Sequence, residues 1–298
     1  MSTTGYANFT DAINHEIEYL KAYGTEVDTG RWQGVPTEGK PDLVTLELMD
    51  VSFRVSMWQG GHPESTDCYL QKDQYLLAVL QDQIKPNLPW ADDHFEERVS
   101  RFASNPGKEY KNWPWWKGQD VQSMTVGGVR EDLMFTHTYQ ERFWPKFAGL
   151  EGRRQDSQPI MGIRYEYGDL DDVVNMLVQD PHTRQAYLPI FFPEDTGAVH
   201  GGRIPCTLGY HFLLRNDQLH LWYDIRSCDA VRHFRDDVYL ATRLALWVID
   251  QCKKGAFLEY GGAGQEPFKS SGWQGVRPGI LTFSAHSFHV HKGDLHLL

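Results

Sequence analysis

Hydrophobic positions follow a helical period in several parts of the chain. Apolar residues recur there every three or four positions, and this spacing predicts amphipathic helices. The segments with this pattern are 9–24, 73–84, 91–103, 168–180 and 237–255. The last segment is the most apolar of them, so we expect it to form the central, buried helix.

Other segments alternate between apolar and polar residues, which is typical of strands with one buried face. These segments are 43–57 (one strand or a pair), 186–192, 207–215, 218–227 and 279–298. Asn216 and Asp217 lie between two of them and are residue types that favour a tight hairpin turn. No repeat or linker interrupts the chain, so we predict a single α+β domain over residues 1–298.

Composition places the chain among globular proteins, with 298 residues of which 41% are hydrophobic and 23% charged. The net charge of -11 argues against a nucleic-acid partner, because such a partner requires a basic surface. No apolar run is long enough to span a bilayer, and residues 1–20 lack the pattern of a signal peptide. We therefore expect a cytoplasmic protein without a membrane or nucleic-acid partner.

The cysteines are candidates for chemistry, although a cysteine on a strand is more often a small buried hydrophobic residue. Cys68, Cys206, Cys228 and Cys252 form no closely spaced pair, which argues against a metal site or a disulfide framework. Cys206 precedes the first strand of the predicted hairpin, and Arg226 lies near the end of the second. Antiparallel pairing would bring them together, and a nearby cation favours the reactive thiolate.

Further motifs follow one another in the second half of the chain. They are FTHTYQERFW at 135–144, LVQDPHTRQAYLPIF at 177–191, Cys206, YDIRSCD at 223–229, HFRDDVYLA at 233–241 and GILTFSAHSFHVHKGDL at 279–295. Their order resembles the thymidylate synthase family, which includes the pyrimidine nucleotide hydroxymethylases. The resemblance implies a thymidylate synthase-like fold, in which a mixed or antiparallel sheet packs with helices and mediates a homodimer.

The resemblance also implies a covalent mechanism at carbon 5 of a pyrimidine nucleotide. The Cys206 thiolate would add to carbon 6, which makes carbon 5 a nucleophile toward the methylene group of 5,10-methylenetetrahydrofolate. The other expected roles belong to Tyr139 near carbon 5, to Asp229 and Trp113 at the folate, and to Glu97 as general acid/base. Spacing leaves the adjacent Glu96 open for that last role, with Glu97 favoured.

The same resemblance implies how the nucleotide is held. The expected phosphate ligands are Arg31, Arg184, Arg226 and Ser227, and the expected sugar ligands are His289 and His291. A guanidinium suits this task because it pairs with a phosphate through two hydrogen bonds. Arg184 would reach the site of the other subunit of the homodimer. The sequence departs from the family at Gln185, where a second arginine is usual, and at His291, where a tyrosine is usual.

Asp237 indicates which base is read. Thymidylate synthases carry asparagine at the corresponding position, whereas cytosine-specific hydroxymethylases carry aspartate. A carboxyl group can accept a hydrogen bond from the exocyclic amine of cytosine and share a proton with N3, and uracil would leave these groups unpaired. Thr207, directly after Cys206, resembles the same branch. The alternative is that Asp237, or more readily Asp236, only caps the following helix.

We therefore predict a cytidylate 5-hydroxymethyltransferase that uses 5,10-methylenetetrahydrofolate and no metal, with water completing the reaction. The chain ends seven residues after His291, without the C-terminal segment that covers the folate in synthases. Residues 55–135 are a candidate replacement for this lid, and a looser lid would favour water over hydride. The changed sugar motif slightly favours CMP, as in nucleoside antibiotic biosynthesis, over dCMP, as in phage DNA modification.

Two other functions compete with this prediction. One is a uridylate methylase or hydroxymethylase, which Asp237 disfavours. The other is a non-catalytic nucleotide-binding protein of the same fold. The joint presence of Cys206, Arg184, Arg226 and Tyr139 argues against it.

Overall fold

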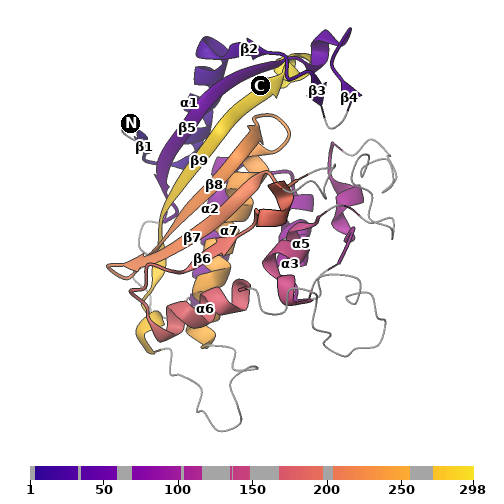
Figure 1. Cartoon of the computed structure of the whole chain (residues 1–298). Coiled ribbons are helices and arrows are strands. Elements are labelled where there is room, and N and C mark those ends of the chain that lie inside the picture. Colours follow the sequence, from indigo (N-terminus) through magenta and orange to yellow (C-terminus); the bar gives the residue numbers. More distant parts are fainter. Residues whose placement is uncertain are drawn as a thin grey trace.

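The fold is organised around one large sheet with helices packed along it (Figure 1). The computed structural model describes residues 4–32, 35–58, 69–101, 104–115, 135, 137–147, 168–196, 204–255 and 271–298. Within the described residues, no helix has the length and apolarity that crossing a bilayer requires.

The described strands of the main sheet lie in the order β1-β5-β9-β8-β7-β6, with β2 beside β5. Their bounds are β1 Thr4–Tyr6, β2 Thr25–Val27, β5 Thr45–Ser56, β6 Tyr187–Pro189, β7 Thr207–Arg215, β8 Gln218–Asp229 and β9 Arg277–His291, and β3 Arg31–Trp32 pairs separately with β4 Val35–Pro36. Strand β9 runs antiparallel to β5 and parallel to β8, so the sheet is mixed, as the resemblance implied.

The predicted hairpin is confirmed, because β7 and β8 pair antiparallel on either side of Asn216 and Asp217. Both turn residues have positive φ angles, 51° and 56°. A two-residue turn with this geometry follows the right-handed twist of its strands, and asparagine and aspartate tolerate the left-handed conformation better than most residues.

The predicted helices are also present. Their bounds are α1 Phe9–Tyr23, α2 Tyr69–Ile84, α3 Trp90–Val99, α5 Tyr139–Phe143, α6 Leu170–Gln179 and α7 Phe234–Lys254, with short 3-10 turns at Pro41–Leu43, Glu109–Asn112, Pro145–Phe147, Pro193–Thr196, Ser271–Trp273 and Lys292–Leu297. Helix α7 is the central helix, since thirteen of its residues are buried, as its apolar pattern predicted.

One face of the sheet forms the core through an aromatic row. Phe53 of β5 pairs with Phe283 of β9, which pairs with Tyr223 of β8, which pairs with Tyr210 of β7. All four side chains are buried, and Phe234 of α7 packs against the first two of them. Because burial of apolar area stabilises a fold at about 25 cal/mol per Å², this face anchors α7 to the sheet.

The opposite face of the sheet carries a second row, one residue along each strand. Tyr187 of β6, His211 of β7 and Trp222 of β8 are cross-strand partners, with ring centroids 5.9 and 6.2 Å apart. Tyr187 is 43% exposed, and His211 and Trp222 remain partly accessible. Figure 1 shows α2 and α7 behind the sheet and no described helix over this face at β6, β7 and β8.

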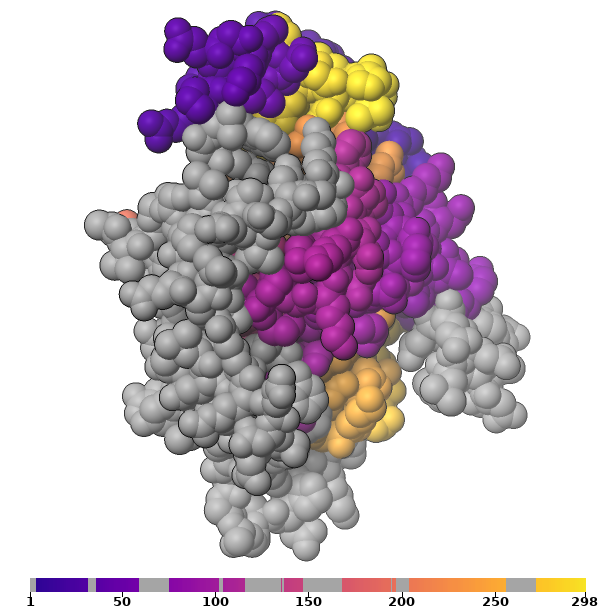
Figure 2. Space-filling view, turned by 90° about the vertical axis from the view of Figure 1, so that its right-hand side faces the viewer, coloured from indigo at the N-terminus to yellow at the C-terminus, as the bar shows by residue number. Residues whose placement is uncertain are grey.

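The first and last described parts of the chain meet at one end of the molecule (Figure 2). Residues 279–298 were predicted to be strand to the end, which is wrong for the last seven residues. Strand β9 ends at His291, and a 3-10 turn follows over Lys292–Leu297. The Lys292 amide donates to the Val44 carbonyl and Gly293 packs on Asp42, so the chain bends over the N-terminal part.

Candidate active site

The Cys206 thiol and the Arg226 guanidinium lie together where β7 begins. The Arg226 amide donates a 2.9 Å hydrogen bond to the Cys206 carbonyl, which fixes the pairing of the two strands. Arg226 Nη2 lies 3.9 Å from Cys206 Sγ, and the guanidinium also donates to the carbonyls of Pro205 and Ile204. A cation at this distance stabilises a thiolate. The proximity predicted from the hairpin is confirmed.

A cavity of about 210 Å³ lies beside this thiol. It is smaller than the pockets of about 300–1,000 Å³ that take drug-sized ligands. Five of the predicted site residues line it, namely Cys206, Ser227, Tyr139, Asp237 and Trp113. The wall is completed by aromatic and polar side chains that include Trp90, His94, Arg98, Tyr110, Phe135, His137 and His233.

Asp237 lies in the first turns of α7 and its half-buried side chain lines the cavity. Among the described residues its carboxyl group accepts no hydrogen bond, and the N-cap residue of α7 is His233. Burial raises the pKa of Asp237 to about 7, against the opposing effect of Arg98. A carboxyl that is partly protonated near neutral pH can both accept and donate a hydrogen bond to a base.

The adjacent Asp236 has a structural role. It is 2% exposed and accepts hydrogen bonds of 2.8 Å from the backbone amide and from the side-chain amide of Asn87. Burial raises the pKa of the Asp236 carboxyl, and the two bonds from Asn87 oppose this shift. The side chain therefore fastens the start of α7 to the segment between α2 and α3.

Replacing Asp236 by alanine is expected to lower the free energy of unfolding by roughly 1–3 kcal/mol, because the Asn87 donors lose their buried acceptor. The preference for cytosine or uracil should not change, since both carboxyl oxygens of Asp236 already accept hydrogen bonds from Asn87. Urea denaturation checks the first statement, and the ratio of cytosine to uracil nucleotide binding checks the second. A mutant of unchanged stability would contradict the structural role.

Tyr139 connects the cavity to the core through hydroxyl groups. Its hydroxyl shares a 3.1 Å hydrogen bond with that of Thr207, which in turn lies 3.0 Å from the Tyr223 hydroxyl. Burial, together with the nearby Cys206, raises the pKa of Tyr139 to about 12. The phenol is therefore a neutral hydrogen-bond donor at the cavity wall, close to the predicted nucleophile.

The two candidate glutamates occupy different environments. Glu96 is 67% exposed and forms an ion pair of 2.7 Å with Arg243. Glu97 is 13% exposed and lies beside His94, which lines the cavity. Of the two, only Glu97 neighbours a residue of the cavity wall, and the preference for it as general acid/base stays a prediction.

Glu97 itself is not part of the cavity wall. Its carboxylate accepts hydrogen bonds from the backbone amides of Lys108 and Glu109, and a Cβ atom at Gly107 would approach its Oε1 to 2.8 Å. Burial would raise the pKa of Glu97, but His94 and these amides outweigh it and hold the pKa below its usual value. In this geometry Glu97 anchors the loop at 104–109, and its role as general acid/base stays a prediction.

His94 and Arg98 are among the cavity residues that sequence reasoning missed. They lie one helical turn apart on α3, and Arg98 Nε donates a 2.9 Å hydrogen bond to His94 Nε2. Burial and the charge of Arg98 lower the pKa of His94 to about 4, so its ring is neutral. The pattern of α3 predicted a helix but gave no sign that these polar residues face inward.

The predicted phosphate ligands separate into two groups. Arg226 and Ser227 lie at the Cys206 end of β8, next to the cavity. Arg31 is exposed in the β3–β4 pair, and neither it nor Arg184 lines the cavity. Arg184 is exposed beside the second aromatic row, where its carbonyl accepts a 3.1 Å hydrogen bond from the His211 ring.

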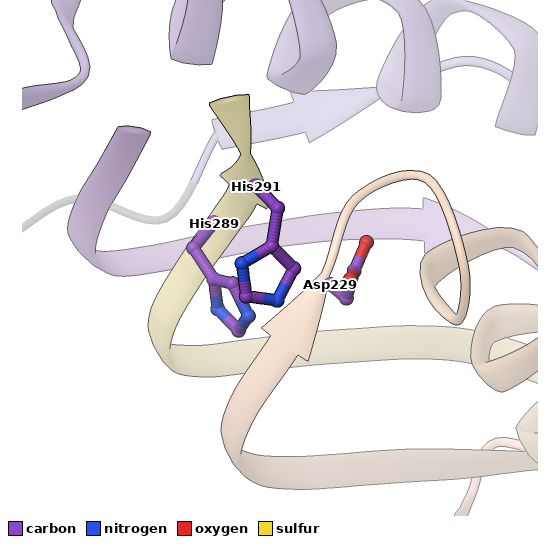
Figure 3. A group of neighbouring side chains, drawn as sticks. All are labelled: Asp229, His289 and His291. Atoms are coloured by element: carbon purple, nitrogen blue, oxygen red, sulfur yellow. The ribbon is translucent and has the colours of Figure 1, made fainter. Parts of the chain in front are cut away.

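Asp229, His289 and His291 gather where β8 and β9 end (Figure 3). One ligand atom from each lies within 4.8 Å of the others, so the group could hold a metal ion. However, Arg232 Nε lies 3.8 Å from Asp229 Oδ2, and a second cation would be repelled there. Asp229 Oδ1 already accepts from the Val231 and Arg232 amides, so hydrogen bonding to a polar ligand fits the group better.

The described part of the tryptophan-rich loop forms one side of the cavity. Trp113 stacks on His233 with ring centroids 4.9 Å apart. The indole nitrogens of Trp113 and Trp115 are buried and have no hydrogen-bond partner among the described residues. Cys228 is fully buried, as expected, whereas Cys68 and the part of the candidate lid at 59–68 and 116–134 lie outside the described residues.

Comparison with known proteins adds one finding. No protein-family model and no curated protein sequence matches the chain. Among solved structures, the fold is similar to that of the thermostable thymidylate synthase A from Bacillus subtilis, with a TM-score of 0.57 at 15% sequence identity. The similarity covers 97% of this chain and 82% of that chain. The chain therefore has a thymidylate synthase-like α+β fold, as the motifs predicted.

Proposed function

We propose that the protein is a cytidylate 5-hydroxymethyltransferase. The observation that carries this proposal is the Asp237 carboxyl in the same small cavity as the Cys206 thiol and the Tyr139 hydroxyl. A thiol beside a cation suits addition to carbon 6 of a pyrimidine, and a carboxyl suits the amine of cytosine. The thymidylate synthase-like fold supports a one-carbon transfer at carbon 5.

The cavity residues Cys206, Asp237 and Tyr139 each have a task in this reaction. Cys206 forms the bond to carbon 6, with Arg226 stabilising its thiolate form. Asp237 accepts a hydrogen bond from the exocyclic amine and shares its proton with N3, which a pKa of about 7 allows. The Tyr139 hydroxyl provides a polar group near carbon 5, and its hydrogen bond to the Thr207 hydroxyl keeps it in position.

5,10-Methylenetetrahydrofolate supplies the one-carbon unit at the oxidation level of formaldehyde. The indole nitrogens of Trp113 and Trp115, which have no partner among the described residues, fit a flat ring system that carries hydrogen-bond acceptors, as a pterin does. Trp113 would orient this ring, and Asp229 would contact its polar edge. Thr207 beside Cys206, together with Asp237, favours the hydroxymethylase branch, in which water completes the product.

Other predicted residues hold the phosphate and the sugar, and one of them, Ser227, also lines the cavity. Arg226 and Ser227 bind the phosphate, and His289 and His291 bind hydroxyl groups of the sugar. Arg31 completes the phosphate site. Arg184 serves the site of a second subunit, which its exposure beside the row of Tyr187, His211 and Trp222 supports. This aromatic face, which no described helix covers, is suited to pairing with its copy in a homodimer.

The mass of the nucleotide product identifies which reaction the protein catalyses. The purified protein is incubated with 5,10-methylenetetrahydrofolate and, separately, with CMP, dCMP, UMP or dUMP, and the nucleotides are analysed by mass spectrometry. A gain of one formaldehyde on a cytosine nucleotide is expected, with CMP favoured over dCMP. Addition of a methyl group would make the protein a methylase, and no product with any nucleotide would favour a binding protein.

The shared site predicts complementation between two defective variants. Cys206→Ala and Arg184→Ala should each be defective alone, and a mixed dimer contains one site with both an intact thiol and a partner arginine. Random mixing is therefore expected to restore about a quarter of the sites, measured as product formation after subunit exchange. Absence of recovery, with dimers confirmed by light scattering, would contradict the role of Arg184 across the interface.

A further inference from the structure

Arg98 is a buried cation whose environment differs from that of the other buried arginine. It is 5% exposed, lies on α3 and lines the cavity together with Cys206 and Asp237. The comparably buried Arg142 forms a two-bond ion pair with Asp195, with both contacts at 2.8 Å. Arg98 forms no ion pair with any carboxylate among the described residues, although burying a guanidinium without one is costly.

The contacts of Arg98 leave most of its donors available. Nε donates to His94 Nε2, and the guanidinium carbon lies 4.0 Å from the centroid of the Tyr139 ring. The ring contact uses the flat face of the guanidinium, so the edge with its terminal N–H groups remains for another partner. Among the described residues no hydrogen bond from these terminal groups is found, and the side chain borders the cavity.

We propose that Arg98 is a further catalytic residue, which donates hydrogen bonds to O2 of a bound cytosine and stabilises the negative charge that develops on the ring. This inference rests on the proposed function. When Cys206 sulfur forms its bond to carbon 6, the electron pair of the C5–C6 double bond moves into the ring and spreads over carbon 5, N3 and O2. Arg98 keeps its protons, and its positive charge, on a side chain that is 5% exposed, offsets the new negative charge.

Arg98 also complements Asp237 in reading the base. Cytosine presents a donor at its exocyclic amine and acceptors at N3 and O2. Asp237 accepts from the amine and shares its proton with N3, and Arg98, on another element of the cavity wall, supplies donors for O2. The guanidinium acts on Asp237 across the cavity, since its charge opposes the effect of burial on the pKa of that carboxyl.

Exchange of the hydrogen at carbon 5 tests the proposed step without folate. The thiolate adds to carbon 6, carbon 5 takes up a proton from solvent and then loses the tritium as a triton, and departure of the thiolate restores the C5–C6 double bond. We would measure tritium release from 5-tritiated CMP without folate, for the wild-type protein and for Arg98→Met, Arg98→Lys and Arg98→Ala. The matched control is Arg101→Gln, on the same segment but paired with Asp171 at 2.9 Å. Arg98→Met is expected to slow release by about 100-fold, and Arg101→Gln to leave it near the wild-type rate.

Folding and chemistry are separated by two further readouts. Added guanidinium ion is expected to restore part of the rate of Arg98→Ala, which it would not do for a merely structural role. Arg98→Lys, which keeps the charge but loses the planar donors, should be at least tenfold slower than wild type. Rates of Arg98→Met or Arg98→Lys within threefold of wild type would overturn the inference. Absence of product from the wild-type protein would instead overturn the proposed function, and this inference with it.

Discussion

Replacing Cys206 by alanine is expected to reduce turnover by roughly 10⁴-fold or more, because no other group can form the bond to carbon 6. Nucleotide binding should remain nearly unchanged, since the phosphate, sugar and base contacts are made by other side chains. Product formation measures the first effect, and isothermal titration with CMP measures the second. The split between the two separates a nucleophile from a binding residue.

The matched control is Cys252→Ala, because Cys252 is a fully buried thiol of α7 outside the cavity. It should retain the wild-type turnover per folded molecule and lose some stability. A 5-fluorocytidylate with folate should add its mass to the wild-type protein and to Cys252→Ala but not to Cys206→Ala. Residual turnover of Cys206→Ala above a tenth of wild type would remove Cys206 from the mechanism.

Replacing Asp237 by asparagine is expected to shift the preference from cytosine toward uracil nucleotides by at least about 100-fold. The amide offers a donor to O4 and an acceptor to the N3 hydrogen of uracil, and it cannot share a proton with N3 of cytosine. Binding constants for CMP and UMP measure the shift. Asp236→Asn is the neighbouring control, because that side chain is engaged with Asn87. An unchanged ratio in Asp237→Asn would leave Asp237 without a role in reading the base.

The same mutant tests the environment of Asp237 without any substrate. An aspartate has a pKa of about 3.9 in an unfolded chain, and burial raises that of folded Asp237 to about 7. Between these values the folded state holds a proton that the unfolded state has lost, so stability falls as pH rises through this window. Wild type should therefore lose stability relative to Asp237→Asn from pH 4 to 7, measured by urea denaturation. A constant difference would contradict the raised pKa.

Local pattern was a good guide to the elements of this fold. The turn at Asn216 and Asp217 was predictable because its residue types tolerate the left-handed conformation, and the hairpin then brought Arg226 to Cys206. Helix α7 was predictable because its apolar surface has to be buried. The strand prediction was wrong for the last seven residues, because contacts with Val44 and Asp42, which are distant in sequence, bend the chain after His291.

Within the site, the sequence determined the residue types and their order, from Cys206 through Arg226 to Asp237. Both Asp236 and Asp237 border the cavity, and only the tertiary structure decided which of the two carboxyls is left for a ligand, because Asn87 donates to Asp236. The inward position of Arg98 also depends on tertiary structure, because its guanidinium packs on the Tyr139 ring where α3 meets that residue. Helical spacing determines on which side of its helix a side chain lies. The residues that this side contacts depend on how elements far apart in the chain pack together.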